Sequence, residues 1–337
     1  MVVAATRLVI LVLAALGLAG GAVARAAAEE TSLALPAVSL TFTAAYVAVD
    51  QGFWAKQGLN VKIVDIQGVG SPNAVIAGSV DFTVTTASTF GRAAARGQRM
   101  LVIANLLDRP MMELVMRKDF ADAAGFRSGT SLSERAKLLK GATIGVDGIY
   151  TNLHAFTQLV ALRGGLDPEK DLRVTPLTAP TMPAALQTKA IDGFTSSLPW
   201  TIDAVQSGAA VMIASSPRGD LPELLPFNYA VVMTRPQLCA ERRSICAKMA
   251  QGFALATQFI REHPQETAVL AAKRFPQTAA PVLATAVETI RAATPEKPVA
   301  TLEGFENSEQ FNLKAGMLKP EEALKTFDGL FTADYIQ

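Results

Sequence analysis

The hydrophobic pattern between residues 38 and 90 alternates between the spacing of strands and the spacing of helices. Apolar runs predict three strands, at 38–42, 61–66 and 80–85. A helix that carries Tyr46 on its apolar face lies between the first two strands and ends at Gly58. A second helix begins at Ser71-Pro72, and a third begins near Thr86. Strands that alternate with short helices predict parallel pairing, with a ligand crevice at the carboxyl ends of the strands.

The same order of elements returns in the second half of the chain. A strand at 142–146 precedes a helix that Thr151 can cap, and a strand at 172–177 precedes a short helix from Thr181. Residues 190–197 then deliver hydroxyl groups to another helix start, as residues 80–88 do in the first half. This repetition predicts an α/β fold with two similar lobes. One large sheet is the alternative.

The chain after Pro236 is predicted to be helical. Amphipathic segments follow one another at 245–260, 265–274, 279–293, 307–317 and 320–327. Such a tail needs an apolar surface to cover, and folding back over the first lobe supplies one. We therefore expect lobe one to comprise 29–112 and 231–337, and lobe two to comprise 113–230. Two strand-like crossings, near 107–115 and 227–234, would then form a hinge.

Residues 1–28 have the features of a signal peptide. Arg7 precedes an uncharged run at 8–24, and Ala24-Arg25-Ala26 fits a signal-peptidase site, with Ala28 as a later alternative. A membrane anchor is the other interpretation, but the run is short for a span of about 20 residues and contains glycines near its end. We expect an exported, soluble product, most simply periplasmic.

The charge balance argues against a nucleic-acid partner. The chain has 31 Lys and Arg against 30 Asp and Glu, and loss of Arg7 and Arg25 with the signal peptide leaves 29 basic residues. A nucleic-acid-binding protein would show a basic excess.

Two cysteines, Cys239 and Cys246, lie seven residues apart. On one unbroken helix their Cα atoms would be about 10 Å apart, which is too far for a disulfide. A break in the helix near 241–244 would bring them within reach. A disulfide and two buried thiols therefore both remain open.

Catalytic chemistry has little support in the residue pattern. The chain has two histidines, His154 and His263, and no His/Cys/Asp spacing that is typical of a metal site. It also lacks a phosphate loop and a Gly-x-Ser-x-Gly elbow. We predict no catalytic residue, no metal and no cofactor.

Several segments, taken in order, resemble the nitrate/sulfonate/taurine group of periplasmic solute-binding proteins. These segments are 46–61, 77–82, 140–146, 165–168 and 190–193. The resemblance implies the ligand-capturing component of an ABC importer, which works with a membrane permease. The group also includes binders of thiamine-pyrimidine precursors and an enzyme relative, the thiamine-pyrimidine synthase. Leu198 stands where many relatives have an acidic residue, so the resemblance carries no amine-binding role to that position.

We predict that an anion binds at the N-termini of two helices. Their unpaired N–H groups and partial positive charge hold anions without a basic side chain. Such starts at Thr86 to Ser88 and at Tyr150 to Asn152 occupy corresponding points of the two lobes. Ordinary capping is the alternative for each hydroxyl.

Other candidates come from the strand ends, the crossings and the aromatic residues. Tyr46 and Trp200 could wall the apolar part of a ligand or belong to the core. Asp108 could recognise an amine or hydroxyl, or serve a salt bridge or turn. The predicted ligand-binding set is Tyr46, Gln67, Gly68, Thr86, Ser88, Asp108, Tyr150, Thr151, Asn152, Ser197, Trp200 and Asn228.

The first functional hypothesis is an exported monomer that captures a small anionic organic solute for an ABC permease. A binder of a thiamine-pyrimidine precursor on the same scaffold is the second. A secreted enzyme derived from the scaffold is the third.

Overall fold

The computed structural model describes residues 28–336. The predicted signal peptide therefore lies outside the described residues, except for its last residue. Within the described range, no helix is both long enough and apolar enough to cross a bilayer.

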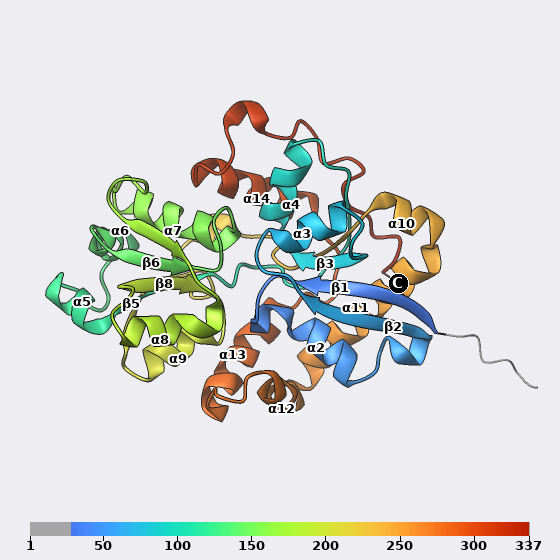
Figure 1. Ribbon diagram of the computed structural model, residues 1–337, viewed down its shortest axis with the longest axis horizontal. Helices are drawn as coiled ribbons and strands as arrows, with labels where there is room; N and C mark the ends of the chain where they lie inside the picture. The colour runs from blue at the N-terminus through green and yellow to red at the C-terminus, as the bar shows by residue number, and fades with distance from the viewer. Residues whose placement is uncertain (1–27, 337) are drawn as a thin grey trace, which may run out of the picture.

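Two five-stranded sheets form the framework of the molecule (Figure 1). The first has the order β2-β1-β3-β10-β4 and consists of β1 (Glu29–Leu35), β2 (Leu59–Asp65), β3 (Phe82–Thr85), β4 (Leu101–Asn105) and β10 (Val231–Thr234). The second has the order β7-β6-β8-β5-β9 and consists of β5 (Glu113–Arg117), β6 (Thr143–Val146), β7 (Arg173–Pro176), β8 (Gly193–Ser196) and β9 (Ala210–Ser215). The prediction of two similar α/β lobes is confirmed.

The sheets are mixed, so the expectation of parallel pairing holds only in part. β1 pairs in parallel with β2 and β3, and β6 pairs in parallel with β7 and β8. β10 and β5, the strands that enter each sheet from the other lobe, run antiparallel to their neighbours. A strand that arrives directly from the other lobe starts at the carboxyl ends of the parallel strands, which face that lobe, and therefore runs antiparallel to them.

The predicted strand at 38–42 is wrong. Leu40–Phe42 is a single 3₁₀ turn, and the first strand is β1, which lies nearer the N-terminus. The Ser39 hydroxyl accepts a hydrogen bond from the Thr41 amide and so caps the turn. Leu40 and Phe42 are buried in this turn. Their alternating apolar pattern is therefore compatible with a compact turn as well as with a strand.

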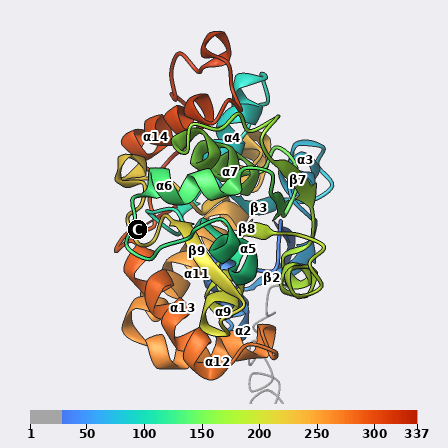
Figure 2. The same cartoon turned by 90° about the vertical axis from the view of Figure 1, so that its left-hand side faces the viewer.

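Helices cover both faces of each sheet (Figures 1 and 2). They are α2 (Thr43–Asp50), α3 (Gly70–Ile76), α4 (Ala87–Ala95), α5 (Lys118–Ala123), α6 (Leu132–Ala136), α7 (Asn152–Arg163), α8 (Met182–Gln187), α9 (Trp200–Gln206), α10 (Pro236–Glu241), α11 (Arg243–Glu262), α12 (Pro264–Arg274), α13 (Ala280–Ala293) and α14 (Leu302–Lys314). α11 and α12 pack on α2, and α14 packs on α4. The helical tail therefore folds back over the first lobe, as predicted, while α13 also contacts α9 of the second lobe.

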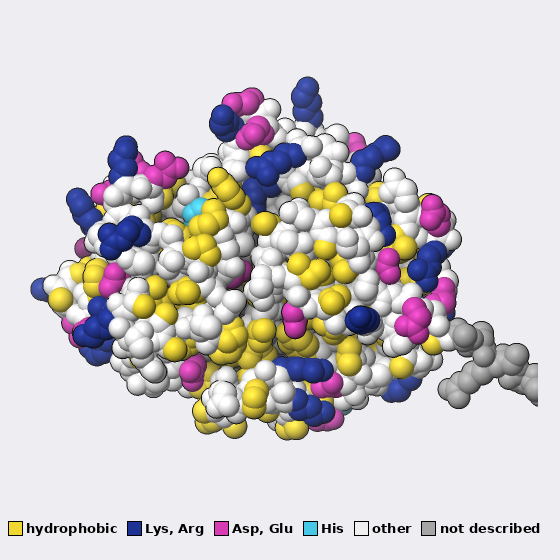
Figure 3. All heavy atoms as spheres, viewed as in Figure 1, with side chains coloured by type: hydrophobic (Ala, Val, Ile, Leu, Met, Phe, Trp, Pro, Cys, Tyr) yellow, Lys and Arg dark blue, Asp and Glu magenta, His cyan; other side chains and the backbone are white. Residues whose placement is uncertain are grey.

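Charged side chains are interspersed over the face shown in Figure 3 rather than gathered in one patch. Uncharged side chains dominate the central boundary between the lobes on this face.

The cysteines form a disulfide. α10 ends at Glu241 and α11 begins at Arg243, so the helix is broken at Arg242. The break brings the Cα atoms of Cys239 and Cys246 to 5.6 Å, and the two sulfurs are bonded. Of the two possibilities left open by the sequence, the structure has the bridge.

The two crossings between the lobes pair with each other through their backbones. The Leu106 amide donates to the Ala230 carbonyl at 2.7 Å, and the Tyr229 amide donates to the Leu107 carbonyl at 2.9 Å. The Phe227 amide donates to the Asp108 carbonyl at 3.0 Å. The connection is thus a short two-stranded ribbon.

Close packing of Trp54 against α11 gives a stability prediction. The Trp54 ring lies over Gly252, where an added Cβ would be 2.1 Å from ring atoms Cδ1 and Nε1. Because Trp54 is buried and its N–H donates to the Met249 carbonyl, the ring cannot move away freely. We expect Gly252→Ala to lower the free energy of unfolding by about 1–3 kcal/mol in urea titrations.

Gly91→Ala is the matched control. Gly91 is also a buried helical glycine, but the nearest atom to an added Cβ is 4.0 Å away. We expect no loss of stability there, because alanine favours helix by about 1 kcal/mol over glycine. Equal effects of the two substitutions would contradict this account of the Trp54 packing.

Candidate functional site

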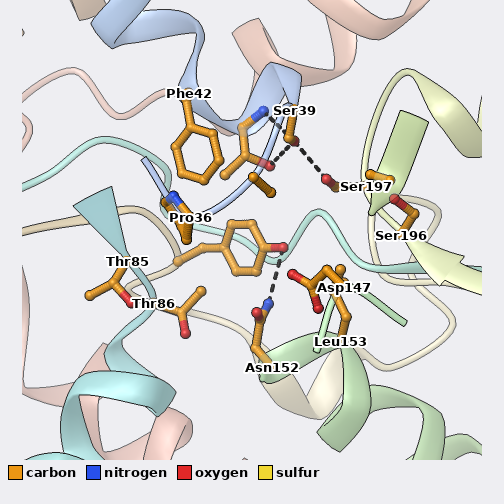
Figure 4. A pocket seen from close by; sticks show the side chains of 14 residues that line it. Pro36, Ser39, Phe42, Thr85, Thr86, Asp147, Asn152, Leu153, Ser196 and Ser197 are labelled. Atoms are coloured by element: carbon orange, nitrogen blue, oxygen red, sulfur yellow. Dashed lines mark hydrogen bonds between the residues drawn. The ribbon is translucent and has the colours of Figure 1, made fainter. Parts of the chain in front are cut away.

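A small cavity of about 50 Å³ lies between the two sheets (Figure 4). Both lobes and the return crossing contribute to its wall. The lining residues are Pro36, Ala37, Ser39, Thr41, Phe42, Thr85, Thr86, Asp147, Asn152, Leu153, Ala179, Ser196, Ser197 and Tyr229. The cavity therefore lies at the carboxyl ends of parallel strands, where an α/β sheet places its ligands.

The wall from the first lobe is formed by strand ends and tight turns. Pro36 and Ala37 follow β1, and the capped turn that follows them presents Ser39 and Phe42. Thr85 ends β3, and Thr86 is the N-cap of α4. The Thr86 hydroxyl accepts a hydrogen bond from the Thr89 backbone N–H. This wall is rich in hydroxyl groups and carries one aromatic ring.

The wall from the second lobe repeats this construction. Asp147 follows β6, and Ser196 ends β8, the parallel neighbour of β6. Asn152 and Leu153 form the first turn of α7, after the N-cap Thr151. Corresponding strand ends and helix starts of both lobes thus face one space.

Tyr229 comes from the return crossing. Its hydroxyl oxygen accepts a hydrogen bond from the side-chain Nδ2 of Asn152 at 3.3 Å, so it connects the crossing with the start of α7. Burial raises the pKa of Tyr229 above its ordinary value, and the phenol stays protonated at neutral pH. It can therefore donate a hydrogen bond into the cavity.

Asp147 is the acidic residue of the cavity wall. Its Oδ1 accepts a 2.7 Å hydrogen bond from the Thr151 hydroxyl. Burial raises the pKa of Asp147 to about 6, although the Thr151 hydrogen bond works in the opposite direction. The wall contains no lysine, arginine or histidine that could balance this carboxylate.

Ser196 has an unmet hydrogen bond. Its side chain is 1% exposed, and within residues 28–336 its Oγ has no partner. A buried hydroxyl without a partner is costly, and a bound molecule in the cavity can supply the missing bond.

Direct contacts hold the lobes together on either side of the cavity. The Ser39 and Ser197 hydroxyls are 2.6 Å apart, and the Leu40 amide donates to the Leu198 carbonyl at 2.9 Å. Arg92 of α4 donates to the Tyr150 carbonyl at 2.5 Å. The structure thus has the lobes closed on each other.

The comparison with protein-family models matches residues 39–267, which are 229 of the 337 residues, to the model described as NMT1/THI5 like. The chain belongs to the NMT1/THI5-like family. The matched range contains every residue of the cavity wall except Pro36 and Ala37. The comparison with curated protein sequences found no match.

Solved structures share the fold of this NMT1/THI5-like chain. The alkanesulfonate-binding protein SsuA from Xanthomonas axonopodis pv. citri, bound to MOPS, matches with a TM-score of 0.69 and 14% identity over 89% of this chain and 97% of that chain. The nitrate-binding protein NrtA from Synechocystis PCC 6803 matches with a TM-score of 0.60 and 14% identity over 76% of this chain and 69% of that chain. The desulfurization enzyme DSZB matches with a TM-score of 0.60 and 16% identity over 91% of this chain and 97% of that chain. At these identities the likeness shows the fold alone, that of periplasmic binding proteins.

Three of the predicted ligand-binding residues line the cavity: Thr86, Asn152 and Ser197. Thr151 does not line the cavity, but it contacts residues that do. Its hydroxyl caps α7 by accepting a hydrogen bond from the His154 backbone N–H, and it donates a hydrogen bond to Asp147. The predicted helix starts at Thr86 and Thr151 are confirmed as N-caps.

The two predicted aromatic walls lie elsewhere. Tyr46 packs edge-on against Phe275, with the Arg274 guanidinium over its ring, outside the cavity. Trp200 donates its ring N–H to the Val38 carbonyl at 2.8 Å and also packs against Phe275. Of the two positions that the sequence left open for these rings, a ligand wall or the core, each ring lies on a helical face that packs against the C-terminal helices. Phe42 and Tyr229 supply the aromatic wall instead.

Five other predicted residues lie outside the wall. Gln67 is exposed, and Gly68 takes a positive φ of 55° beside the Thr151 methyl group. Ser88 is fully buried and hydrogen-bonds Thr86. Asp108 is half-buried and its side chain pairs with Arg109, and Tyr150 is 62% exposed.

Asn228 and His154 have structural contacts. The buried Asn228 side chain bonds the backbone of Thr301 through both its amide atoms. His154 accepts a hydrogen bond from the Tyr150 amide at its Nδ1, and its burial lowers its pKa. His154 is thus tied into the start of α7 by its own hydrogen bonds.

Several wall residues were not predicted. Thr41, Phe42 and Ser39 belong to the turn that was interpreted as a strand, and Ser196 and Tyr229 are neighbours of predicted residues. Asp147 directly follows a predicted strand, and this position was the available signal.

Asp147 gives a prediction for stability against pH. Its pKa is raised from 3.8 to about 6, so the folded protein binds this proton more tightly than the unfolded chain does. Its contribution to stability is therefore favourable at low pH and is lost as the pH rises through about 4 to 6. We compare the free energies of unfolding of Asp147→Asn and of the wild type, both without ligand. Between pH 4 and pH 7 we expect this difference to shift by about 1–3 kcal/mol in favour of Asp147→Asn.

Urea unfolding of both proteins at the two pH values measures this gain. The Asn side chain keeps an acceptor for the Thr151 hydroxyl, so the comparison isolates the charge. A difference in stability between the two proteins that does not change with pH contradicts the raised pKa of Asp147.

Proposed function

We propose that this protein is the exported solute-binding component of an ABC importer. In this proposal it captures a small anionic organic solute between its lobes, acts as a monomer in the periplasm, and delivers the solute to a permease in the inner membrane. The observation that carries the proposal is one cavity lined by strand ends and helix starts of both lobes.

The start of α7 supports an anionic solute. Among the described residues, the backbone N–H groups of Asn152 and Leu153 have no acceptor, and both residues line the cavity. Unpaired amides at the start of a twelve-residue helix carry partial positive charge and bind anions without a basic side chain. The hydroxyl groups of Thr86 in the first lobe and Ser197 in the second lobe add polar contacts to the wall.

Capture needs no chemical step. A solute that contacts both lobes stabilises the closed arrangement over an open one, and only that difference in affinity shifts the population. The cavity wall contains no histidine or cysteine, and both cysteines are joined in the disulfide between α10 and α11. These observations favour capture over turnover, although DSZB is an enzyme on the same fold.

A thiamine-pyrimidine precursor is the second candidate. The match to the NMT1/THI5-like model and the two aromatic rings of the wall, Phe42 and Tyr229, favour it. A planar ring could pack against either of them, rather than against Tyr46 or Trp200 as the sequence suggested.

Thermal unfolding with added sulfonates, carboxylates, nitrate and pyrimidines tests the proposal. We expect an anionic organic solute at a hundredfold excess over its Kd to raise the Tm by about 5 °C or more. Asn152→Ala should weaken that binding about tenfold in calorimetry, because it removes a polar side chain from the anion site.

Asn73→Ala is the matched control, since Asn73 is exposed on α3 and lies outside the cavity. It should bind as the wild type does. A Tm increase with a neutral pyrimidine alone would overturn the anionic solute and leave the second candidate.

A further inference from the structure

A charged side chain of the first lobe reaches the second lobe where α4 meets the start of α7 (Figure 1). Arg92 of α4 is 4% exposed, and its Nη2 donates to the Tyr150 carbonyl at 2.5 Å. Every ion pair that residues 28–336 form lies within one lobe or within a crossing. A hydrogen bond from a charged donor is stronger than one between neutral groups, such as the contact of Ser39 with Ser197.

Arg92 is held in this position by its own lobe. Its Nη1 donates to Asn312 Oδ1 of α14, and its Nη2 also donates to Thr89 Oγ1 at 3.2 Å. The Asn312 side chain is fixed in turn, because its Nδ2 donates to the Ser88 carbonyl at 2.8 Å. Burial lowers the pKa of Arg92 to about 10, so the guanidinium keeps its charge at neutral pH. A side chain that is already oriented loses little conformational freedom when the lobes close.

The acceptor on the second lobe is held in a conformation that needs support. Tyr150 has a φ of 63°, in the left-handed region that residues with a side chain seldom adopt. Its N–H donates to Nδ1 of His154 at 3.1 Å, and its ring packs edge-on against the same imidazole. His154 and Arg92 therefore bind the two backbone groups of this one residue, from opposite lobes.

This contact lies next to the cavity without being part of its wall. Tyr150 directly precedes Thr151, the N-cap of α7, and Asn152 in the first turn of α7 lines the cavity. Neither Arg92 nor His154 is among the lining residues. Both can therefore act on the closure of the lobes without touching an enclosed solute.

We propose that Arg92 is a positioning residue for capture, and that with His154 and the Tyr150 carbonyl it forms a latch that stabilises the closed arrangement of the lobes. The role of this latch in capture rests on the proposed solute-binding function. On opening, the Arg92 donor and the Tyr150 carbonyl separate. The latch therefore sets how long a solute stays enclosed.

Protonation of His154 releases the latch. A protonated Nδ1 carries a hydrogen and cannot accept from the Tyr150 N–H. Burial and, second, the charge of Arg92 lower the pKa of His154 from its ordinary value of 6.5. Because opening moves Arg92 away, the open arrangement binds this proton more tightly than the closed one does. The contribution of the latch is therefore complete above about pH 6.5 and is lost as the pH falls further.

Two other titratable side chains lie near this histidine. Asp147 is connected to it through the Thr151 hydroxyl, which bonds both the Asp147 carboxylate and the His154 N–H. The pKa of Asp147, about 6, falls in the same pH range. Tyr229 of the return crossing stays protonated at neutral pH. A pH profile of the wild type alone would thus combine His154 with Asp147.

The helices that pack on α7 add no further charge at this point. α14 supplies the uncharged Asn312 side chain to Arg92. α6 contacts the opposite end of α7, where the backbone at Ala136 lies close to Gly164. Variants of His154 therefore separate its titration from that of Asp147, which they leave in place.

Distances between spin labels on the two lobes, measured without any solute, test the latch. The labels are placed at Asn73→Cys on α3 and Gln187→Cys on α8, which are exposed positions of the first and second lobe. We expect the free wild type to show a closed and an open population at pH 7.5. Arg92→Met should lower the ratio of closed to open by about tenfold to a hundredfold, the range of one hydrogen bond to a charged group.

Arg96→Met is the matched control. Arg96 carries the same charge one turn further along α4, but it is exposed and forms no hydrogen bond to the second lobe within residues 28–336. It should leave the ratio of closed to open unchanged. Urea unfolding of each variant checks that the lobes themselves remain folded.

Two variants of His154 test the latch from the second lobe. His154→Leu removes the acceptor of the Tyr150 N–H and should lower the closed population at every pH. His154→Asn places its Oδ1 where Nδ1 lies and carries no titrating group, so it should keep the closed population at pH 7.5. Between pH 7.5 and pH 5 the ratio should fall about threefold to tenfold further in the wild type than in His154→Asn. A merely structural role of His154 would not produce this difference in pH dependence.

A free wild type without a closed population, or the same ratio in Arg92→Met as in the wild type, overturns the latch. The same pH dependence in the wild type and in His154→Asn overturns it as well. These results do not depend on a bound solute. A thermal screen in which no solute binds would instead overturn the proposed function, so the two failures are distinguishable.

Discussion

The pairing of the two crossings is the constraint on which the site depends. Three backbone hydrogen bonds join residues 106–108 to residues 227–230, so the two chain passages form one ribbon instead of two independent linkers. The ribbon holds the sheets so that the carboxyl ends of β1, β3, β6 and β8 face each other. It also supplies Tyr229 to the wall, and hence any rotation about the ribbon changes the cavity directly. The ribbon therefore sets both where the cavity lies and how a rotation of the lobes changes it.

The chemistry of the cavity follows from what its wall contains. Hydroxyl groups, amides at the start of α7 and one carboxyl group can hold a polar molecule in a defined orientation, but they offer no nucleophile paired with a base. The NMT1/THI5-like family shares its fold with binding proteins and with an enzyme. On such a scaffold the side chains of the wall decide the function.

Local signals in the sequence predicted the lobes and the helix starts well. The repeated order of elements gave two sheets, and the hydroxyls of Thr86 and Thr151 gave the caps, because both features depend on neighbours in the chain. The sequence left the positions of Tyr46 and Trp200 open between a ligand wall and the core, since periodicity shows that both residues are on apolar helical faces but not which element covers those faces. Asp147 was missed for a related reason: only the pairing of β6 with β8 puts it beside Ser196 and makes it face the cavity.

The most direct test of the account measures the distance between the lobes in solution. Spin labels at Asn73→Cys on α3 and Gln187→Cys on α8 report it, because both positions are exposed and the native cysteines are joined in a disulfide. With a solute that calorimetry shows to be bound, the account predicts that a longer-distance population in the free protein is replaced by one shorter, narrower distribution. Identical distributions for the free and the saturated protein would contradict capture by closure of the two lobes.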